Sequence, residues 1–181
     1  MSTVDEELLL AEGRSQGPLE PREAVLTLAR AKAEDVADTV PSSPPAVVVG
    51  CDSMLEVAGT LVGKPHTAAV ARERWRAMRG TYGVLHTGHW VVDTRTGRSV
   101  GDVSSTTVHF ADLNDEEIDT YVASGEPLEV AGAFTVDGRG AAFVTSIQGD
   151  HHAVVGISIA TLRLLLRTLD ISITDLWSSS S

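Results

Sequence analysis

Asp52 and Lys64 are the residues whose types and spacing best suit phosphate chemistry, a carboxylate followed a dozen positions later by a lysine. Asp52 comes just after a hydrophobic strand predicted over Ala46–Gly50, and ligands of α/β sheets gather in the crevice outside such strand ends. Lys64 lies between Gly63 and Pro65, which hold a lysine more rigidly against a phosphate than a flexible surface arm does. The plainer alternatives are an aspartate that caps a turn and an ordinary solvated lysine.

Lys32 and Glu6 are two further candidates, and each also has a simpler explanation. Lys32 lies one turn after Leu28, at the edge of the apolar face of a helix predicted to begin at Pro21. A lysine in such a position commonly packs its stem on the core and keeps its amine in water. Glu6 could bind a metal ion or a sugar, whereas acidic residues near a terminus are commonly just solvated.

Other catalytic and metal-binding motifs are absent from the sequence. The six histidines show no HExxH or similar ligand spacing, and His86 and His89 would face opposite sides of a strand. There is no P-loop, no G-x-G-x-x-G fingerprint and no G-x-S-x-G nucleophile elbow. Cys51 follows apolar residues and is predicted to be a buried, unreactive thiol.

The composition indicates a globular, cytoplasmic protein that binds neither nucleic acid nor membranes. The 181 residues are 43% hydrophobic, enough for a real core, and the formal net charge of −11 repels nucleic acid and anionic membranes. A single cysteine excludes an internal disulfide and fits a reducing compartment. The acidic N-terminus differs from a basic signal peptide, and no apolar run approaches the roughly 20 residues of a membrane span.

The elements that must position these residues alternate between helices and strands, which favours a layered α/β fold. Residues 1–20 are predicted to form a loop, followed by the helix from Pro21, a strand, a short hairpin and a second helix. Two strands joined by TRTG come next, then a helix, a strand and a last helix. The predicted boundaries are a turn at Gly59 and helix N-caps at Thr67, Asn114 and Ser158.

Seven stretches of the chain together carry a resemblance to a known family. They are TVDEE, LARAKAEDVA, VVVGCDSML, LVGKPHTAAVARERWRAMRG, HTGHWVV, TTVHFADLNDEEIDTYVASGEPLEVAGAFTVDGRG and IQGDHHAVVGISIATLRLLL. In this order they resemble the Maf family of nucleoside triphosphate pyrophosphatases and cover nearly all of residues 3–170. The forms GCDSML and RERWRAMRG look like the actinobacterial branch.

The resemblance implies an α/β fold in which helices flank a central mixed, twisted β-sheet, similar to Maf and inosine-triphosphatase proteins. It implies one domain over residues 1–177 with a cleft between two lobes, and we expect a disordered tail at residues 178–181. It further implies an enzyme that cleaves a nucleoside triphosphate to a monophosphate and pyrophosphate, with the clearing of non-standard nucleotides as one role.

The resemblance also implies roles for the four candidate residues. Asp52 matches the family's general base, Glu6 its pocket glutamate, and Lys32 and Lys64 its two lysines, which bind substrate. The implied cofactor is a divalent cation, Mg²⁺ or Mn²⁺, with Asp52 and Glu6 as its ligands.

The N-terminus departs from the family pattern. Members normally begin with a strand and a phosphate loop of the form LASxSPRR before the VDE stretch, whereas this chain starts at Met1, just short of it. We therefore expect either that the true start lies upstream of Met1 or that the first strand and its loop are missing. In the second case an exposed sheet edge would favour a homodimer. The alternative hypothesis is a catalytically impaired nucleotide-binding or regulatory protein linked to septum formation or cell-division arrest.

Overall fold

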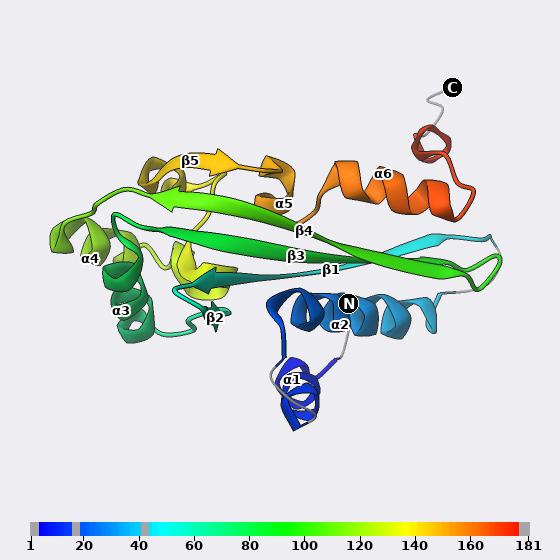
Figure 1. Ribbon diagram of the computed structural model, residues 1–181, viewed down its shortest axis with the longest axis horizontal. Coiled ribbons are helices and arrows are strands. Elements are labelled where there is room, and N and C mark those ends of the chain that lie inside the picture. The colour runs from blue at the N-terminus through cyan, green and yellow to red at the C-terminus, as the bar shows by residue number, and fades with distance from the viewer. Residues whose placement is uncertain (1–3, 16–18, 41–43, 178–181) are drawn as a thin grey trace. The chain divides into compact units, whose positions relative to one another are not determined.

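The computed structural model describes residues 4–15, 19–40 and 44–177 of the chain. In these residues five strands form one sheet in the order β2-β1-β3-β4-β5 (Figure 1). The pairs β1·β2 and β4·β5 are antiparallel, so the mixture of parallel and antiparallel strands that we expected is not seen in these two pairs.

The predicted α/β fold with helices flanking a central sheet is confirmed. The strands are β1 (Val47–Val57), β2 (Thr60–Val62), β3 (Tyr82–Asp93), β4 (Ser99–Phe110) and β5 (Val144–Gln148).

Three helices begin where a capping side chain was predicted, at Thr67, Asn114 and Ser158. Each of these side chains accepts a hydrogen bond from the backbone N–H three residues later. None of the described helices is long and apolar enough to cross a membrane. The α-helices are α1 (Glu6–Ser15), α2 (Pro21–Ala37), α3 (Ala68–Met78), α4 (Asp115–Ala123), α5 (His151–Val155) and α6 (Ile159–Thr168). The 3-10 helices are η1 (Glu126–Glu129), η2 (Ala131–Ala133), η3 (Arg139–Phe143) and η4 (Ile173–Leu176).

The prediction of a loop over residues 1–20 is wrong for Glu6–Ser15, which form α1. Asp5 precedes this helix, and its Oδ1 accepts a hydrogen bond from the Leu8 N–H at 3.0 Å. Asp5 therefore acts as an N-cap. The apolar run Leu8–Ala11 is too short to show helical periodicity, which explains why the sequence pattern did not reveal the helix.

The predicted end of a strand at Gly50 is also wrong, because β1 continues through Gly50 and Asp52 to Val57. Gly50 is buried inside the strand, and a Cβ atom there would lie 2.2 Å from the Ala29 carbonyl oxygen. The glycine therefore allows α2 to approach the strand closely rather than ending it.

The chain divides into two compact units, the first comprising Met1–Asp52, Thr87–Ser104 and Ile157–Ser181. In this unit α2 packs on the sheet through Gly50 and Gly88, where a Cβ atom would meet helix backbone. The neighbouring residue His89 faces the other way, and its Nε2 accepts a hydrogen bond from the Ser158 N–H before α6. The two helices thus cover opposite sides of these strands (Figure 1). A small core on the α6 side contains Val91, Leu165, Leu166 and Leu169.

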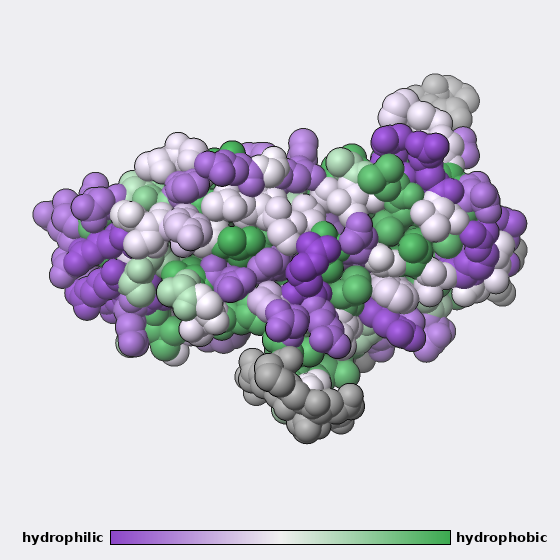
Figure 2. Space-filling model, viewed as in Figure 1, coloured by the Kyte–Doolittle hydropathy of each residue, from purple (hydrophilic) through white to green (hydrophobic). Residues whose placement is uncertain are grey.

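The second unit comprises Ser53–His86 and Ser105–Gly156, with Trp75 of α3 in its core. The indole Nε1 of this fully buried residue donates to the Ala133 carbonyl at 2.8 Å. Hydrophilic residues cover the surface over α3 and α4 (Figure 2), including ion pairs such as Arg79–Asp115. The single domain with a cleft between two lobes stays a prediction, and the predicted tail at residues 178–181 lies outside the described residues.

Candidate active site

Lys32 lies between two carboxylates in the first unit. Its Nζ is 2.5 Å from Asp52 Oδ1 and 2.7 Å from Glu6 Oε1. The exposed fraction of the side chain falls from 45% for Glu6 to 23% for Lys32 and 10% for Asp52. The cluster therefore has an open end at Glu6 and a buried end at Asp52, and the Lys32 amine is paired rather than simply solvated.

The packing of α2 on β1 explains how Lys32 and Asp52 meet. Gly50 and Asp52 are two residues apart in β1 and so point to the same face of the strand. Ala29, Lys32 and Ala33 lie three and four residues apart on one face of α2, and this face approaches Gly50. The close helix–strand contact at Gly50 thus places the lysine against the aspartate.

The two carboxylates keep Lys32 charged at neutral pH. Partial burial alone would lower the pKa of Lys32. Hydrogen bonds from its ammonium to Asp52 and Glu6, together with the attraction of their charges, outweigh burial and raise this pKa above its ordinary value. Lys32 therefore presents a stable positive charge beside the largely buried carboxylate of Asp52.

Lys64, the fourth predicted residue, belongs to the second unit. It follows β2, is exposed, and makes no hydrogen bond or ion pair with the described residues. Three of the four predicted residues thus come together, whereas a single crevice that contains all four stays a prediction.

Comparison with known proteins identifies the family. The Maf-like protein family matches residues 1–169. The chain belongs to the Maf family. A protein of Leifsonia xyli subsp. xyli named nucleoside triphosphate pyrophosphatase is 49% identical over 182 residues, which cover 98% of this chain and 85% of that protein. A protein of the same name from Streptomyces coelicolor is 50% identical over 178 residues, covering 98% and 82% of the two chains. Another from Nocardia farcinica is 52% identical over 161 residues, covering 87% and 76%.

The single cysteine of this Maf protein, Cys51, lies next to the site and is half-buried rather than buried as predicted. Partial burial is the main cause that raises the pKa of the Cys51 thiol to about 11, and the negative charge of Asp52 adds to it. The positive charge of Lys32 opposes this shift. The thiol is therefore protonated at neutral pH, which agrees with the predicted unreactive cysteine.

The carboxylates of the Maf site suit a divalent metal only together with further ligands. Within residues 4–15, 19–40 and 44–177, no group of three or more His, Cys, Asp or Glu side chains is placed to hold a metal ion. Asp52 and Glu6 nevertheless converge on one cation, the Lys32 ammonium. Mg²⁺ is commonly held by one or two carboxylates plus waters and substrate phosphates. The donor set therefore fits a metal that is bound together with a polyphosphate.

Glu126 is an anchoring residue of this Maf protein that sequence reasoning missed. Its carboxylate accepts hydrogen bonds from the hydroxyls of Thr135 at 2.6 Å and Tyr121 at 3.0 Å. It also accepts them from the N–H groups of Arg139 at 3.0 Å and Gly140 at 2.9 Å. Burial would raise the pKa of Glu126, but these four hydrogen bonds outweigh it and hold the pKa at about 2. The available signal was the glycine-rich run that follows, whose backbone N–H groups need an outside acceptor.

We expect Glu126→Gln to lower the free energy of unfolding by about 2–4 kcal/mol at neutral pH, because the amide loses charge-assisted hydrogen bonds. The folded-state pKa of about 2 lies below the ordinary 4.5. The advantage of the wild type is therefore full above pH 4.5 and is lost as the pH falls from there towards 2. Urea denaturation of both proteins over a pH series measures this difference.

Glu73, an exposed residue of α3, provides the control for this experiment. Glu73→Gln should change the free energy of unfolding by less than about 0.5 kcal/mol at every pH. A difference between wild type and Glu126→Gln that does not shrink in acid would show that the charge of Glu126 does not stabilise the fold.

Proposed function

We propose that this Maf protein hydrolyses nucleoside triphosphates to nucleoside monophosphates and pyrophosphate. The observation that carries the proposal is the Asp52 carboxylate, only 10% exposed and held 2.5 Å from the Lys32 ammonium on a long strand. A base beside a fixed positive charge suits the attack of water on a phosphorus atom. Two relatives that match nearly the whole of this chain are named nucleoside triphosphate pyrophosphatase, which supports the same activity.

Asp52 is the proposed general base. The oxygen of a water molecule bonds to the α-phosphorus, while the bond between this phosphorus and the oxygen that bridges to the β-phosphate breaks. Asp52 takes the proton of the attacking water, and the bridging oxygen leaves as part of pyrophosphate. Lys32 is charged at neutral pH, so it can stabilise the negative charge that develops on the phosphate oxygens.

Lys64 and Glu6 are the proposed partners of this pair. The ammonium of Lys64 is exposed and without a partner among the described residues, which leaves it available to a phosphate. Glu6 is the more exposed of the two carboxylates on Lys32, so it is the one that we expect to yield its place to substrate. A bound triphosphate would then share the Lys32 ammonium with Asp52.

A divalent cation, Mg²⁺ or Mn²⁺, is the proposed cofactor. Asp52 and Glu6 would hold it together with phosphate oxygens, since carboxylates and phosphates are the ligands that these ions prefer. When bound, the metal supplies positive charge that neutralises the polyphosphate and activates it towards attack. On a chain with a formal net charge of −11, such local positive charge offsets the repulsion of an anionic substrate.

A purified-protein assay with a panel of nucleoside triphosphates in Mg²⁺ or Mn²⁺ tests the proposed function. We expect equal amounts of monophosphate and pyrophosphate, and no product after chelation of the metal. In water labelled with ¹⁸O, the label should enter the monophosphate, because the proposed attack is at the α-phosphorus. Release of a diphosphate and inorganic phosphate would contradict the proposal, and nucleotide binding without any product would favour the regulatory alternative.

The cytoplasmic location, the lack of nucleic-acid binding and the homodimer stay predictions from the sequence. Gel filtration over a range of protein concentrations tests the dimer.

A further inference from the structure

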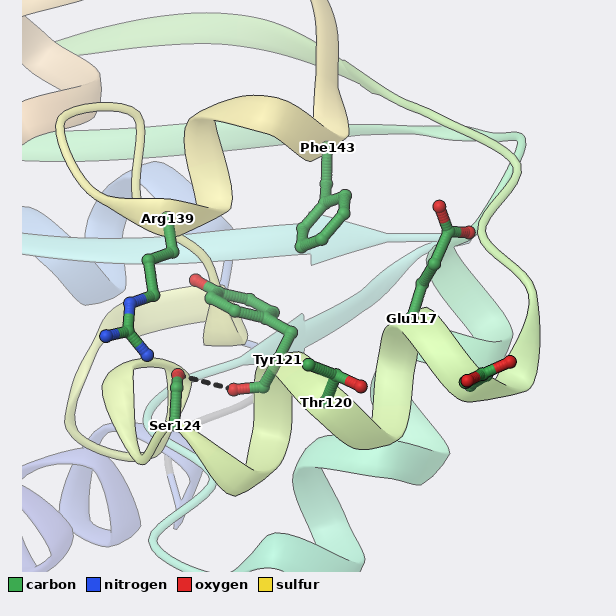
Figure 3. Close-up of a pocket in the computed structure, with 7 residues that line it drawn as sticks. Glu117, Thr120, Tyr121, Ser124, Arg139 and Phe143 are labelled. Atoms are coloured by element: carbon green, nitrogen blue, oxygen red, sulfur yellow. Dashed lines mark hydrogen bonds between the residues drawn. The ribbon is translucent and has the colours of Figure 1, made fainter.

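We propose that a pocket between α4 and η3 binds a short peptide with free termini. The pocket has a volume of about 410 Å³, within the range of about 300–1,000 Å³ that is typical of small-molecule sites. All its residues belong to the second unit, and none of them takes part in the proposed pyrophosphatase reaction. Figure 3 shows the lining residues, which are Glu116, Glu117, Thr120, Tyr121, Ser124, Arg139 and Phe143.

Opposite charges lie at the two ends of this pocket. Arg139 is at the end near Ser124, and Glu117 is at the other end (Figure 3). Glu117 accepts a hydrogen bond from the Asn114 N–H, whereas the carboxylate of Glu116, the next residue in the first turn of α4, makes no hydrogen bond or ion pair with the described residues. The guanidinium of Arg139 likewise has no partner among them. These two charges are therefore available to a ligand that carries an anionic group at one end and a cationic group at the other.

An aromatic wall lies between the charged ends. The rings of Tyr121 and Phe143 have centroids 5.2 Å apart and meet edge to face. Both also contact the buried indole of Trp75, at centroid distances of 5.6 and 5.8 Å. The wall is thus continuous with the core of the unit, and it suits an apolar or aromatic group in the middle of the ligand.

Glu126 fixes this pocket in advance of binding. The Tyr121 hydroxyl donates to its Oε1, and the backbone N–H of Arg139 donates to its Oε2. One carboxylate thus holds both the aromatic wall and the base of the anion-binding side chain. Such preorganisation lowers the entropic cost of binding, because these side chains are already ordered before the ligand arrives.

The spacing of the charged ends selects the length of the ligand. Arg139 lies near Ser124, the residue that follows α4 (Figure 3). Glu117 and Ser124 are seven residues apart, so the two ends of the pocket are separated by roughly 10 Å along the helix axis. Three residues of extended peptide also span roughly 10 Å. A free amino acid carries both charges on one carbon atom, a polyamine has no anion for Arg139, and a nucleotide has no ammonium for the glutamates. Of these four classes, the tripeptide is the one that meets all three features.

Calorimetric titration with the tripeptide Gly-Phe-Gly tests the proposal. We expect saturable binding of one peptide per chain. Acetylation of the peptide N-terminus or amidation of its C-terminus should each weaken binding about tenfold or more, because each removes one charge-assisted contact. Arg139→Gln should weaken binding of the free peptide as much as C-terminal amidation does, and amidation should then cause no further loss. Glu116→Gln should weaken binding as much as N-terminal acetylation does, and acetylation should then cause no further loss.

Both substitutions are at exposed positions, and Arg139→Gln keeps the backbone hydrogen bond to Glu126, so both variants should fold. Arg167→Gln on α6, at an exposed position outside the pocket, is the matched control and should leave the affinity unchanged. The absence of saturable binding at millimolar peptide, or equal binding of blocked and free peptides, would overturn the proposal. Because the measurement uses no nucleotide, its outcome is independent of pyrophosphatase activity.

Discussion

Replacement of Asp52 by asparagine is expected to lower the rate of pyrophosphate release about 10²–10⁴-fold, the usual effect of removing a positioned general base. The amide of asparagine cannot take the proton of the attacking water, although it has nearly the same shape. The Lys32 ammonium keeps Glu6 as a partner, so the fold and the position of the lysine should survive the substitution. Single-turnover measurement of pyrophosphate, with circular dichroism as a test of folding, checks this result.

Asp38, an exposed residue immediately after α2, provides the matched control for this substitution. Asp38→Asn should leave the rate unchanged, because it removes the same charge from the chain without touching the site. A folded Asp52→Asn protein with wild-type turnover would remove Asp52 from the mechanism and leave the proposed function without its base.

Replacement of Gly50 by alanine should lower the free energy of unfolding by about 3 kcal/mol, a large value for one methyl group. The new Cβ would lie 2.2 Å from the Ala29 carbonyl oxygen and 2.8 Å from the Ala33 amide nitrogen, both in the backbone of α2. Backbone cannot rotate away as a flexible side chain can, so the whole helix must shift. Because Lys32 is on the same helix face, we also expect turnover to fall, and urea denaturation together with the turnover assay measures both effects.

Gly63→Ala is the matched control, since a Cβ atom at Gly63 would meet nothing within 4 Å. We expect its free energy of unfolding to stay within about 0.5 kcal/mol of the wild type. If Gly50→Ala were as stable as Gly63→Ala, then α2 would not pack on β1 at this residue, and the close contact that places Lys32 would be wrong.

Several local elements and the family could be predicted from the sequence because their signals are short-range. The N-caps at Thr67, Asn114 and Ser158 depend on a side chain and a backbone N–H three residues away. The turn at Gly59 depends on a residue that accepts a positive φ, here 77°. The family follows from ordered motifs, which also indicated Asp52, Lys32, Glu6 and Lys64 as one set, and the first three of these residues are in contact.

Only the tertiary structure decided which of these residues meet and what surrounds them. Gly50 looks like a strand terminator when only its chain neighbours are considered, yet it is a packing site because Ala29, far away in the chain, lies against it. The convergence of Asp52 and Glu6 on Lys32, and of four donors on Glu126, likewise joins separate segments. Such contacts depend on how helices and loops pack on the sheet. Hydrophobic burial acts on whole faces of these elements, so no single residue of the sequence indicates which elements will meet.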